Sequence, residues 1–266
     1  MTEPNGENPV LVTDRGAVRT VTLNRPAAFN TFDSALKQAL LAALAGAADP
    51  SVRAVVVTGA GRAFCAGQDL KEHLALVAAG DDRVGRTVAE FYNPLVRALQ
   101  GLRKPVIAAV NGPAAGAGTG LALACDLRIA AASATFSMAF AGVGLSADTG
   151  ASYLLPRFVG QGRASTMMLL GEKVDAAEAR RIGLVDQVVD DADLPGTVAA
   201  LADRLAAGPT QAYGWIKASL HHAASSDLDS ALDFEDRAQT ACFASPDHHE
   251  AVRAFVQKRP PEFTGR

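Results

Sequence analysis

The fold is decided by the segment that runs from Thr58 to Leu70, TGAGRAFCAGQDL. It follows a β-branched run at 54–57, and a second glycine-rich loop at 111–120 follows the fully apolar run 106–110. Because glycine lacks a Cβ atom, such loops bring backbone N–H groups close to a ligand at the end of a buried strand. Two strand–loop–helix junctions in one chain predict an α/β core with repeated units.

Three ligand chemistries compete for these two loops. The dinucleotide-binding pattern fails at its sixth position, which is Leu121 in one loop and Phe64 in the other. A phosphate-binding P-loop needs Gly-Lys followed by Ser or Thr at a fixed spacing, and neither loop contains it. The third chemistry is an oxyanion hole, in which one N–H group from each loop points at an oxygen that becomes negative in the transition state.

Composition places the chain among ordinary globular proteins and removes several classes of partner. The 266 residues include 25 basic and 28 acidic side chains, so we expect neither nucleic acid nor a membrane as a partner. Three cysteines outside any CxxC pair and five histidines without ligand spacing predict no metal site. Reduced thiols and the polar N-terminus indicate a cytoplasmic protein.

The chain divides into three predicted regions. Residues 1–9 are rich in Pro, Gly, Asn and Glu and are expected to form a disordered leader. Residues 10–205 carry both glycine-rich loops and form the α/β core. Residues 206–266 have helical patterns too amphipathic to stand alone, so this C-terminal helical region is expected to pack against the core or another subunit.

The chain resembles the crotonase (enoyl-CoA hydratase/isomerase) superfamily over nearly its whole length. The motifs that carry the resemblance are Leu23-Asn24-Arg25-Pro26, 59–70, 104–126, Gly183-Leu184-Val185 and 255–259. Within the superfamily, the chain is most similar to the ring-epoxide phenylacetyl-CoA isomerases of aerobic phenylacetate breakdown, through CAGQDL at 65–70, FYNPLVR at 91–97 and AGAG at 115–118. The resemblance implies a spiral of repeated ββα units with a C-terminal helical oligomerisation region.

The resemblance also implies the site. The N–H groups of Gln68 and Ala117 would form the oxyanion hole for an acyl-CoA thioester, with coenzyme A as part of the substrate and no separate cofactor. The implied positions for binding CoA or the acyl group are Ala28, Ala66, Asp69, Leu70, Gly116, Phe140, Phe255 and Lys258. The last two match positions that reach the CoA of a neighbouring subunit in relatives, which implies a homo-oligomer, either a trimer or a hexamer built as a dimer of trimers.

The carboxylates separate the possible reactions. Hydratases of the superfamily use two glutamates, and the matching positions here are Gly120 and Phe140, neither of which can move a proton. Asp148, in GLSADTG at 144–150, matches the aspartate of the isomerases. One base suffices for isomerisation, and an apolar surrounding of Phe136, Met138 and Phe140 is expected to raise its pKa.

Four interpretations stay open. The first is an acyl-CoA isomerase in which Asp148 shuttles a proton, either to shift a double bond or to open a ring epoxide. The second is an enoyl-CoA hydratase of fatty-acid or aromatic-acid degradation that uses Asp148 alone or an unrecognised group. The third is a non-catalytic acyl-CoA-binding homologue, and the fourth makes Asp148 a turn or helix N-cap residue. Ala147 and Ala151 stand where the ring-epoxide enzymes usually have proline and glycine, which leaves the acyl group open.

Overall fold

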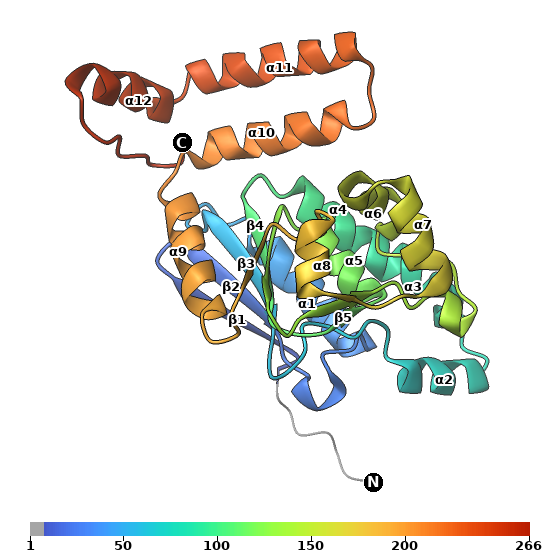
Figure 1. Ribbon diagram of the computed structural model, residues 1–266. Helices are drawn as coiled ribbons and strands as arrows, with labels where there is room; N and C mark the ends of the chain where they lie inside the picture. Colours follow the sequence, from blue (N-terminus) through green and yellow to red (C-terminus); the bar gives the residue numbers. More distant parts are fainter. Residues whose placement is uncertain (1–7) are drawn as a thin grey trace.

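The computed structural model describes residues 8–266 (Figure 1). Most of the expected leader 1–9 therefore lies outside the described residues. Within the described part of the chain, no helix is long and apolar enough to cross a membrane.

A six-stranded sheet forms the centre of the molecule, in the order β1-β2-β3-β4-β6-β9. The first pair of strands is an antiparallel hairpin, and every other pair in this sheet is parallel. A smaller sheet has the order β5-β7-β8. The strands are β1 (Val10–Arg15), β2 (Val18–Leu23), β3 (Ala54–Gly59), β4 (Val106–Val110), β5 (Ala114–Ala115), β6 (Leu127–Ala131), β7 (Thr135–Ser137), β8 (Val174–Asp175) and β9 (Gln187–Val189).

Helices cover both faces of the large sheet and extend beyond it (Figure 1). The α-helices are α1 (Ser34–Gly46), α2 (Leu70–Ala78), α3 (Arg83–Thr87), α4 (Asn93–Gly101), α5 (Ala117–Ala124), α6 (Ala151–Val159), α7 (Gln161–Leu170), α8 (Ala176–Arg181), α9 (Leu194–Ala206), α10 (Thr210–Ala223), α11 (Leu228–Phe243) and α12 (Pro246–Gln257). Three short turns complete the elements: the 3-10 turns η1 (Pro26–Ala28) and η3 (Ala141–Val143), and the π-helical turn η2 (Val88–Tyr92).

Alternating residues of β3 pack into two separate hydrophobic cores. Val55 and Val57 belong to the larger core, which contains the buried faces of α1 and α5. Ala54 and Val56 belong to the smaller core, which α9 covers. Side chains of a strand point to opposite faces in turn, so a strand buried on both faces is apolar throughout. The loop that follows β3 consequently leaves the sheet between two packed layers.

Two elements differ from the patterns in the sequence. A single helix is expected over 84–102, but α3 and α4 are separated by η2, whose wider turn carries Tyr92 into the core. A strand is expected over 184–189, but only Gln187–Val189 pairs with β6. Leu184 instead closes the end of α8 through its N–H bond to the carbonyl of Ala179, at 2.8 Å. An apolar run alone does not separate a strand from a buried helix end.

The C-terminal helices α10, α11 and α12 project from the body of the molecule (Figure 1). Lys217 on α10 joins them to the core, because its Nζ lies 2.8 Å from Asp126 Oδ2 and 2.7 Å from the carbonyl oxygen of Leu99. Large apolar side chains on these helices stay exposed, including Leu220, Leu228, Phe255 and Val256. The subunit contacts and the trimer or hexamer expected for this region stay predictions.

Candidate active site

The two glycine-rich loops pair with each other beyond the ends of β3 and β4. The N–H of Ala115 donates to the carbonyl of Cys65 at 3.0 Å, in a parallel bridge between the loops. Gly67 has a φ of +89°, and a Cβ atom built on it would lie 2.7 Å from the carbonyl oxygen of Ala115 and 3.5 Å from the nitrogen of Ala117. A side chain would collide with that oxygen, so the close approach of the loops requires glycine.

This pairing brings the N–H groups of Gln68 and Ala117 to one place. The neighbours of Gln68 are bonded to Phe32: Phe32 donates to the carbonyl of Gly67 at 2.7 Å, and Asp69 donates to the carbonyl of Phe32 at 3.1 Å. Within residues 8–266, neither the Gln68 N–H nor the Ala117 N–H donates to a protein acceptor. Ala117 is also the first residue of α5, where the helix dipole favours negative charge. The pair can therefore stabilise an oxyanion.

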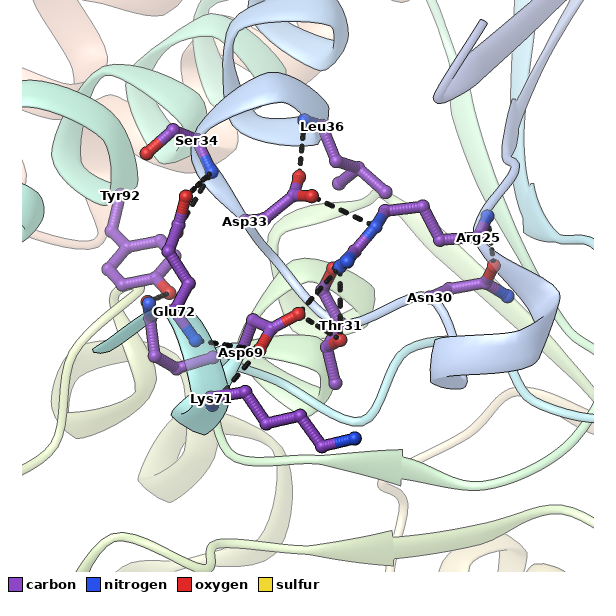
Figure 2. Close-up of polar contacts among 11 residues, drawn as sticks. Arg25, Asn30, Thr31, Asp33, Ser34, Leu36, Asp69, Lys71, Glu72 and Tyr92 are labelled. Atoms are coloured by element: carbon purple, nitrogen blue, oxygen red, sulfur yellow. Dashed lines mark hydrogen bonds and ion pairs between the residues drawn. The ribbon is translucent and has the colours of Figure 1, made fainter. Parts of the chain in front are cut away.

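A polar network holds the first loop in place (Figure 2). Asp69 is the N-cap of α2 and accepts from the N–H groups of Lys71 and Glu72. Arg25 lies between two carboxylates, with Nη1 2.9 Å from Asp69 Oδ2 and Nε 3.0 Å from Asp33 Oδ2. Burial raises the pKa of Asp69, but the hydrogen bonds from Glu72 N–H and Arg25 outweigh it and leave the pKa below the ordinary value. The hydrogen bonds and the ion pair of the Asp69 carboxylate are all with protein groups. Asp69 therefore stabilises the loop.

Asp148 lies in the loop before α6 and does not cap that helix. Its Oδ1 accepts from the Thr149 hydroxyl at 2.7 Å, and the N-cap position of α6 is Gly150, without a side-chain cap. By contrast, Asp33 caps α1 by accepting from the N–H of Leu36 at 2.8 Å. Of the interpretation of Asp148 as a turn or helix N-cap residue, the N-cap part is therefore wrong and the turn part is confirmed, because the N–H of Ala151 donates to the carbonyl of Asp148 at 2.9 Å. The turn uses the backbone carbonyl, so the carboxylate keeps acceptor capacity for a ligand.

Burial raises the pKa of Asp148 above the ordinary aspartate value, while the Thr149 hydroxyl and the charge of Lys37 act in the opposite direction. Phe136, Met138 and Phe140 are buried in the same core as Ala117, and their contact with Asp148 stays a prediction. A carboxylate with a raised pKa takes and returns a proton more readily near neutral pH.

The loop that carries Asp148 occupies the space beside Gly120. A Cβ atom built on Gly120 would lie 2.7 Å from Thr149 Cβ and 2.9 Å from Thr149 O. Thr149 is fully buried and adopts a φ of +49°, which is unusual for a β-branched residue. A glutamate at position 120 is incompatible with this loop, so the glycine and the placement of Asp148 depend on each other.

Two residues of the site were missed by sequence reasoning. The Tyr92 hydroxyl donates to the side-chain Oε1 of Gln68, and its ring packs edge-to-face on Phe32 with centroids 5.8 Å apart. Burial raises the pKa of Tyr92, so the hydroxyl stays protonated as a donor. Tyr92 stands inside the FYNPLVR motif, but the motif assigns it no contact. The second residue is Lys37, a lysine on the apolar face of α1 that is only 5% exposed.

We expect Tyr92→Phe to lower kcat about fivefold with KM nearly unchanged. The variant keeps the ring packing but loses the hydrogen bond that orients Gln68, and such a bond contributes about 1 kcal/mol. Steady-state kinetics on the wild type and the variant measure the split between kcat and KM. A lower melting temperature together with changes in both kcat and KM would instead indicate a purely structural role.

The other residues predicted to bind CoA lie in different parts of the structure. Ala66 donates its N–H to the carbonyl of Phe29 at 3.0 Å, which places it beside Ala28 at the end of η1. Leu70, at the start of α2, is 52% exposed. Phe255 lies in the last turn of α12 and Lys258 is its C-cap residue. Figure 1 places α12 far from α2, so a single chain does not bring the two residues to the site.

Gly116 and Phe140 border the oxyanion pair directly. Gly116 has a φ of +50° and donates its N–H to Ser137 O at 2.9 Å, and a Cβ atom on it would lie 3.7 Å from the Phe140 ring. Phe140 thus packs against the turn that starts α5. Among the described residues there is no group of three or more His, Cys, Asp or Glu side chains placed to hold a metal ion.

Comparisons with known proteins agree with this architecture. The family model described as Enoyl-CoA hydratase/isomerase matches residues 13–266. The chain is 46% identical over 250 residues to a 1,2-epoxyphenylacetyl-CoA isomerase of Escherichia coli K12, which covers 94% of this chain and 95% of that protein. It is 45% identical over 246 residues to a Rhodobacter capsulatus protein named "Probable enoyl-CoA hydratase", with 92% and 94% covered.

Solved structures show the same fold. The crystal structure of an enoyl-CoA hydratase from Bacillus anthracis has a TM-score of 0.91 at 32% identity, over 97% of this chain and 100% of that one. The α/β core predicted from the two loops, and the crotonase fold and superfamily implied by the resemblance, are thereby confirmed. The chain belongs to the enoyl-CoA hydratase/isomerase family.

Proposed function

We propose that the protein is an acyl-CoA isomerase in which Asp148 moves the proton and the N–H groups of Gln68 and Ala117 hold the thioester oxygen. The observations that carry the proposal are a partly buried carboxylate with free acceptor capacity and, on the two glycine-rich loops, two N–H groups without protein acceptors. The two positions that match the hydratase glutamates hold Gly120 and Phe140. One proton-transfer group supports an isomerisation better than a hydration, which needs an acid and a base.

The reaction needs no co-reactant. The Asp148 carboxylate removes a proton from a carbon of the acyl group, and the electron pair of that C–H bond moves toward the thioester carbonyl to form an enolate. The oxyanion accepts hydrogen bonds from Gln68 and Ala117. Each such donor stabilises the transition state by about 3 kcal/mol. The protonated Asp148 then returns the proton to another carbon, which shifts the double bond. Opening of a ring epoxide would use the same enolate stabilisation.

Relatives of nearly equal identity carry both an isomerase and a hydratase name, so a direct test is needed. Purified protein is incubated in deuterium oxide with enoyl and phenylacetyl-type thioesters, and exchange at carbon is followed by mass spectrometry and NMR. An isomerase yields a positional isomer of the substrate, with deuterium at carbon wherever the proton held by Asp148 exchanges with solvent before it is returned. Incorporation of ¹⁸O from labelled water as a hydroxyl group would instead identify a hydratase. Thioester binding by calorimetry with neither exchange nor isomer formation would identify a non-catalytic homologue.

The pH dependence of the reaction follows from the same carboxylate. The base must be ionised, so kcat/KM is expected to fall as pH decreases through the pKa of Asp148. Because burial raises this pKa, the fall is expected at a higher pH than the ordinary aspartate value of 3.8. A pH profile of kcat/KM, corrected for unfolding at each pH, measures the position of this limb. A limb at or below 3.8 would contradict the assigned environment of the base.

A further inference from the structure

A small cavity opens between α1, α2, α3 and η2, with Gln68 of the oxyanion pair in its lining. It has a volume of about 170 Å³, and its lining includes Lys37, Gln68, Glu72, His73, Thr87 and Phe91. A volume of about 150 Å³ accommodates a benzene ring. Gln68 belongs both to this cavity and to the oxyanion pair, whereas Ala117 and Asp148 do not line the cavity. That the acyl group of a bound thioester extends into it is part of the inference made below.

Lys37 is the unusual residue of this cavity. Lysine is almost never fully buried unless it is paired, yet Lys37 is 5% exposed and, across residues 8–266, no carboxylate oxygen lies within 4.0 Å of its Nζ. Its one hydrogen bond goes to Thr87 Oγ1, at 2.7 Å. An ammonium group has three donors, so two remain for a ligand.

The surroundings hold the amine of Lys37 in a fixed place. Its Nζ lies 5.0 Å from the centroid of the Tyr92 ring and 5.5 Å from that of Phe91, which are cation–π distances. Glu72, the carboxylate whose charge acts most strongly on Lys37, uses both of its oxygens to accept from the N–H of Ser34, at 3.0 and 3.1 Å. Because the Glu72 carboxylate is bonded to Ser34, the amine of Lys37 is a hydrogen-bond donor at the cavity that has no carboxylate acceptor from the described part of the protein.

We propose that Lys37 determines specificity by donating a hydrogen bond to an oxygen atom in the distal part of the acyl group. The inference rests on the proposed acyl-CoA site and adds its substrate class: thioesters whose acyl group carries an epoxide, hydroxyl or carbonyl oxygen. A hydrocarbon acyl group in this cavity would leave the ammonium without an acceptor, which costs binding free energy. Burial lowers the pKa of Lys37, and either protonation state of the amine can donate to such an oxygen.

The test measures binding rather than turnover, so that it stays informative if the reaction differs from the one proposed. Two unreactive thioesters, cyclohexylacetyl-CoA and its ring-hydroxylated analogue, are titrated into the protein by calorimetry. We expect the wild type to bind the hydroxylated thioester about 10-fold more tightly, as for a hydrogen bond to a charged group. Equal affinity for the two thioesters would overturn the inference.

Variants assign the preference to the amine. Lys37→Met is expected to reduce the preference below about threefold, and its melting temperature should not fall, because replacing a buried charge with an apolar side chain of similar volume is often neutral or stabilising. If the methionine variant does not fold, Lys37→Leu provides a second apolar side chain for the same test. Gln38→Met is the matched control, since Gln38 is exposed at the same cavity, and it should keep the full preference. A preference that persists without Lys37 would also overturn the inference. Absence of exchange and isomer formation by the wild type, with the preference intact, would contradict only the proposed isomerase.

Discussion

Asp148→Asn is expected to reduce turnover about 10²- to 10⁴-fold while the dissociation constant for a saturated acyl-CoA changes less than about threefold. Asparagine keeps the shape of the side chain and can still accept from the Thr149 hydroxyl, but it cannot remove a proton. Rates from the deuterium-exchange assay and calorimetric affinities measure the two effects separately. Activity within tenfold of the wild type would exclude Asp148 as the base.

The same variant has a predicted effect on stability. Burial raises the pKa of Asp148, so the folded state binds protons more tightly than the unfolded state, and the free energy of unfolding decreases as pH rises between the two pKa values. Asparagine carries no charge and removes this cost. We therefore expect a higher melting temperature for Asp148→Asn at neutral pH, with a difference that shrinks as pH falls through the raised pKa toward the ordinary aspartate value of 3.8.

Asp69→Asn is the control, because its melting temperature at neutral pH is expected to change in the opposite direction. Hydrogen bonds from the Glu72 N–H and Arg25 overcome the effect of burial and hold the pKa of Asp69 below its ordinary value, so its contribution to stability is present above pH 3.8 and is lost as pH falls through the folded pKa. The asparagine variant is expected to melt at a lower temperature than the wild type at neutral pH. If both variants shifted in the same direction, the contrast between the two carboxylates would be wrong.

Gly120→Glu is expected to lose activity by more than about 100-fold, although it restores the residue type that hydratases use at the matching position. Its Cβ atom would lie 2.7 Å from Thr149 Cβ and 2.9 Å from Thr149 O, so the loop would have to move and carry Asp148 with it. Displacing a catalytic group by about 1 Å can cost about 100-fold, and overpacking a core costs about 1–3 kcal/mol of stability. Exchange rates and denaturant unfolding measure the two losses.

Gly142→Glu controls for the added charge and side chain. Gly142 is exposed in η3, and a Cβ atom on it meets nothing within 4 Å. This variant should therefore keep near wild-type activity and stability. Gain of hydration by Gly120→Glu, or no loss of isomerisation, would show that the Thr149 loop yields and that position 120 is open to a second carboxylate.

The amount that could be predicted from the sequence differs between the fold and the site. Glycines at positions 67 and 116 were recognisable because a positive φ or a close backbone approach excludes other residues, and that requirement is local. The apolar runs of β3 and β4 were recognisable because strands buried on both faces are predominantly apolar. The absence of glutamate at position 120 was visible directly, but its steric reason was not.

Tyr92 shows why part of the site could not be predicted. The region 84–102 has a helical pattern, and only the π-helical turn η2 directs this side chain toward Gln68, 24 residues away in sequence. Lys37 is a second example, since a lysine next to the apolar stripe of α1 would ordinarily stay solvated. Its burial depends on η2 packing over it, which is a contact between distant segments.

The sequence by itself determined the two glycine loops, the family and the loss of both hydratase glutamates, because backbone conformation, strand burial and residue identity are properties of short segments. Only the tertiary structure decided which polar groups are already hydrogen-bonded or packed within the protein and which remain free for a ligand. It engages Asp69 with Arg25, leaves Asp148 free of a capping role, packs Thr149 against Gly120 and buries Lys37 beside the cavity. Acceptor capacity and desolvation depend on neighbours that the chain brings together only on folding, and these two quantities set which groups can act on a substrate.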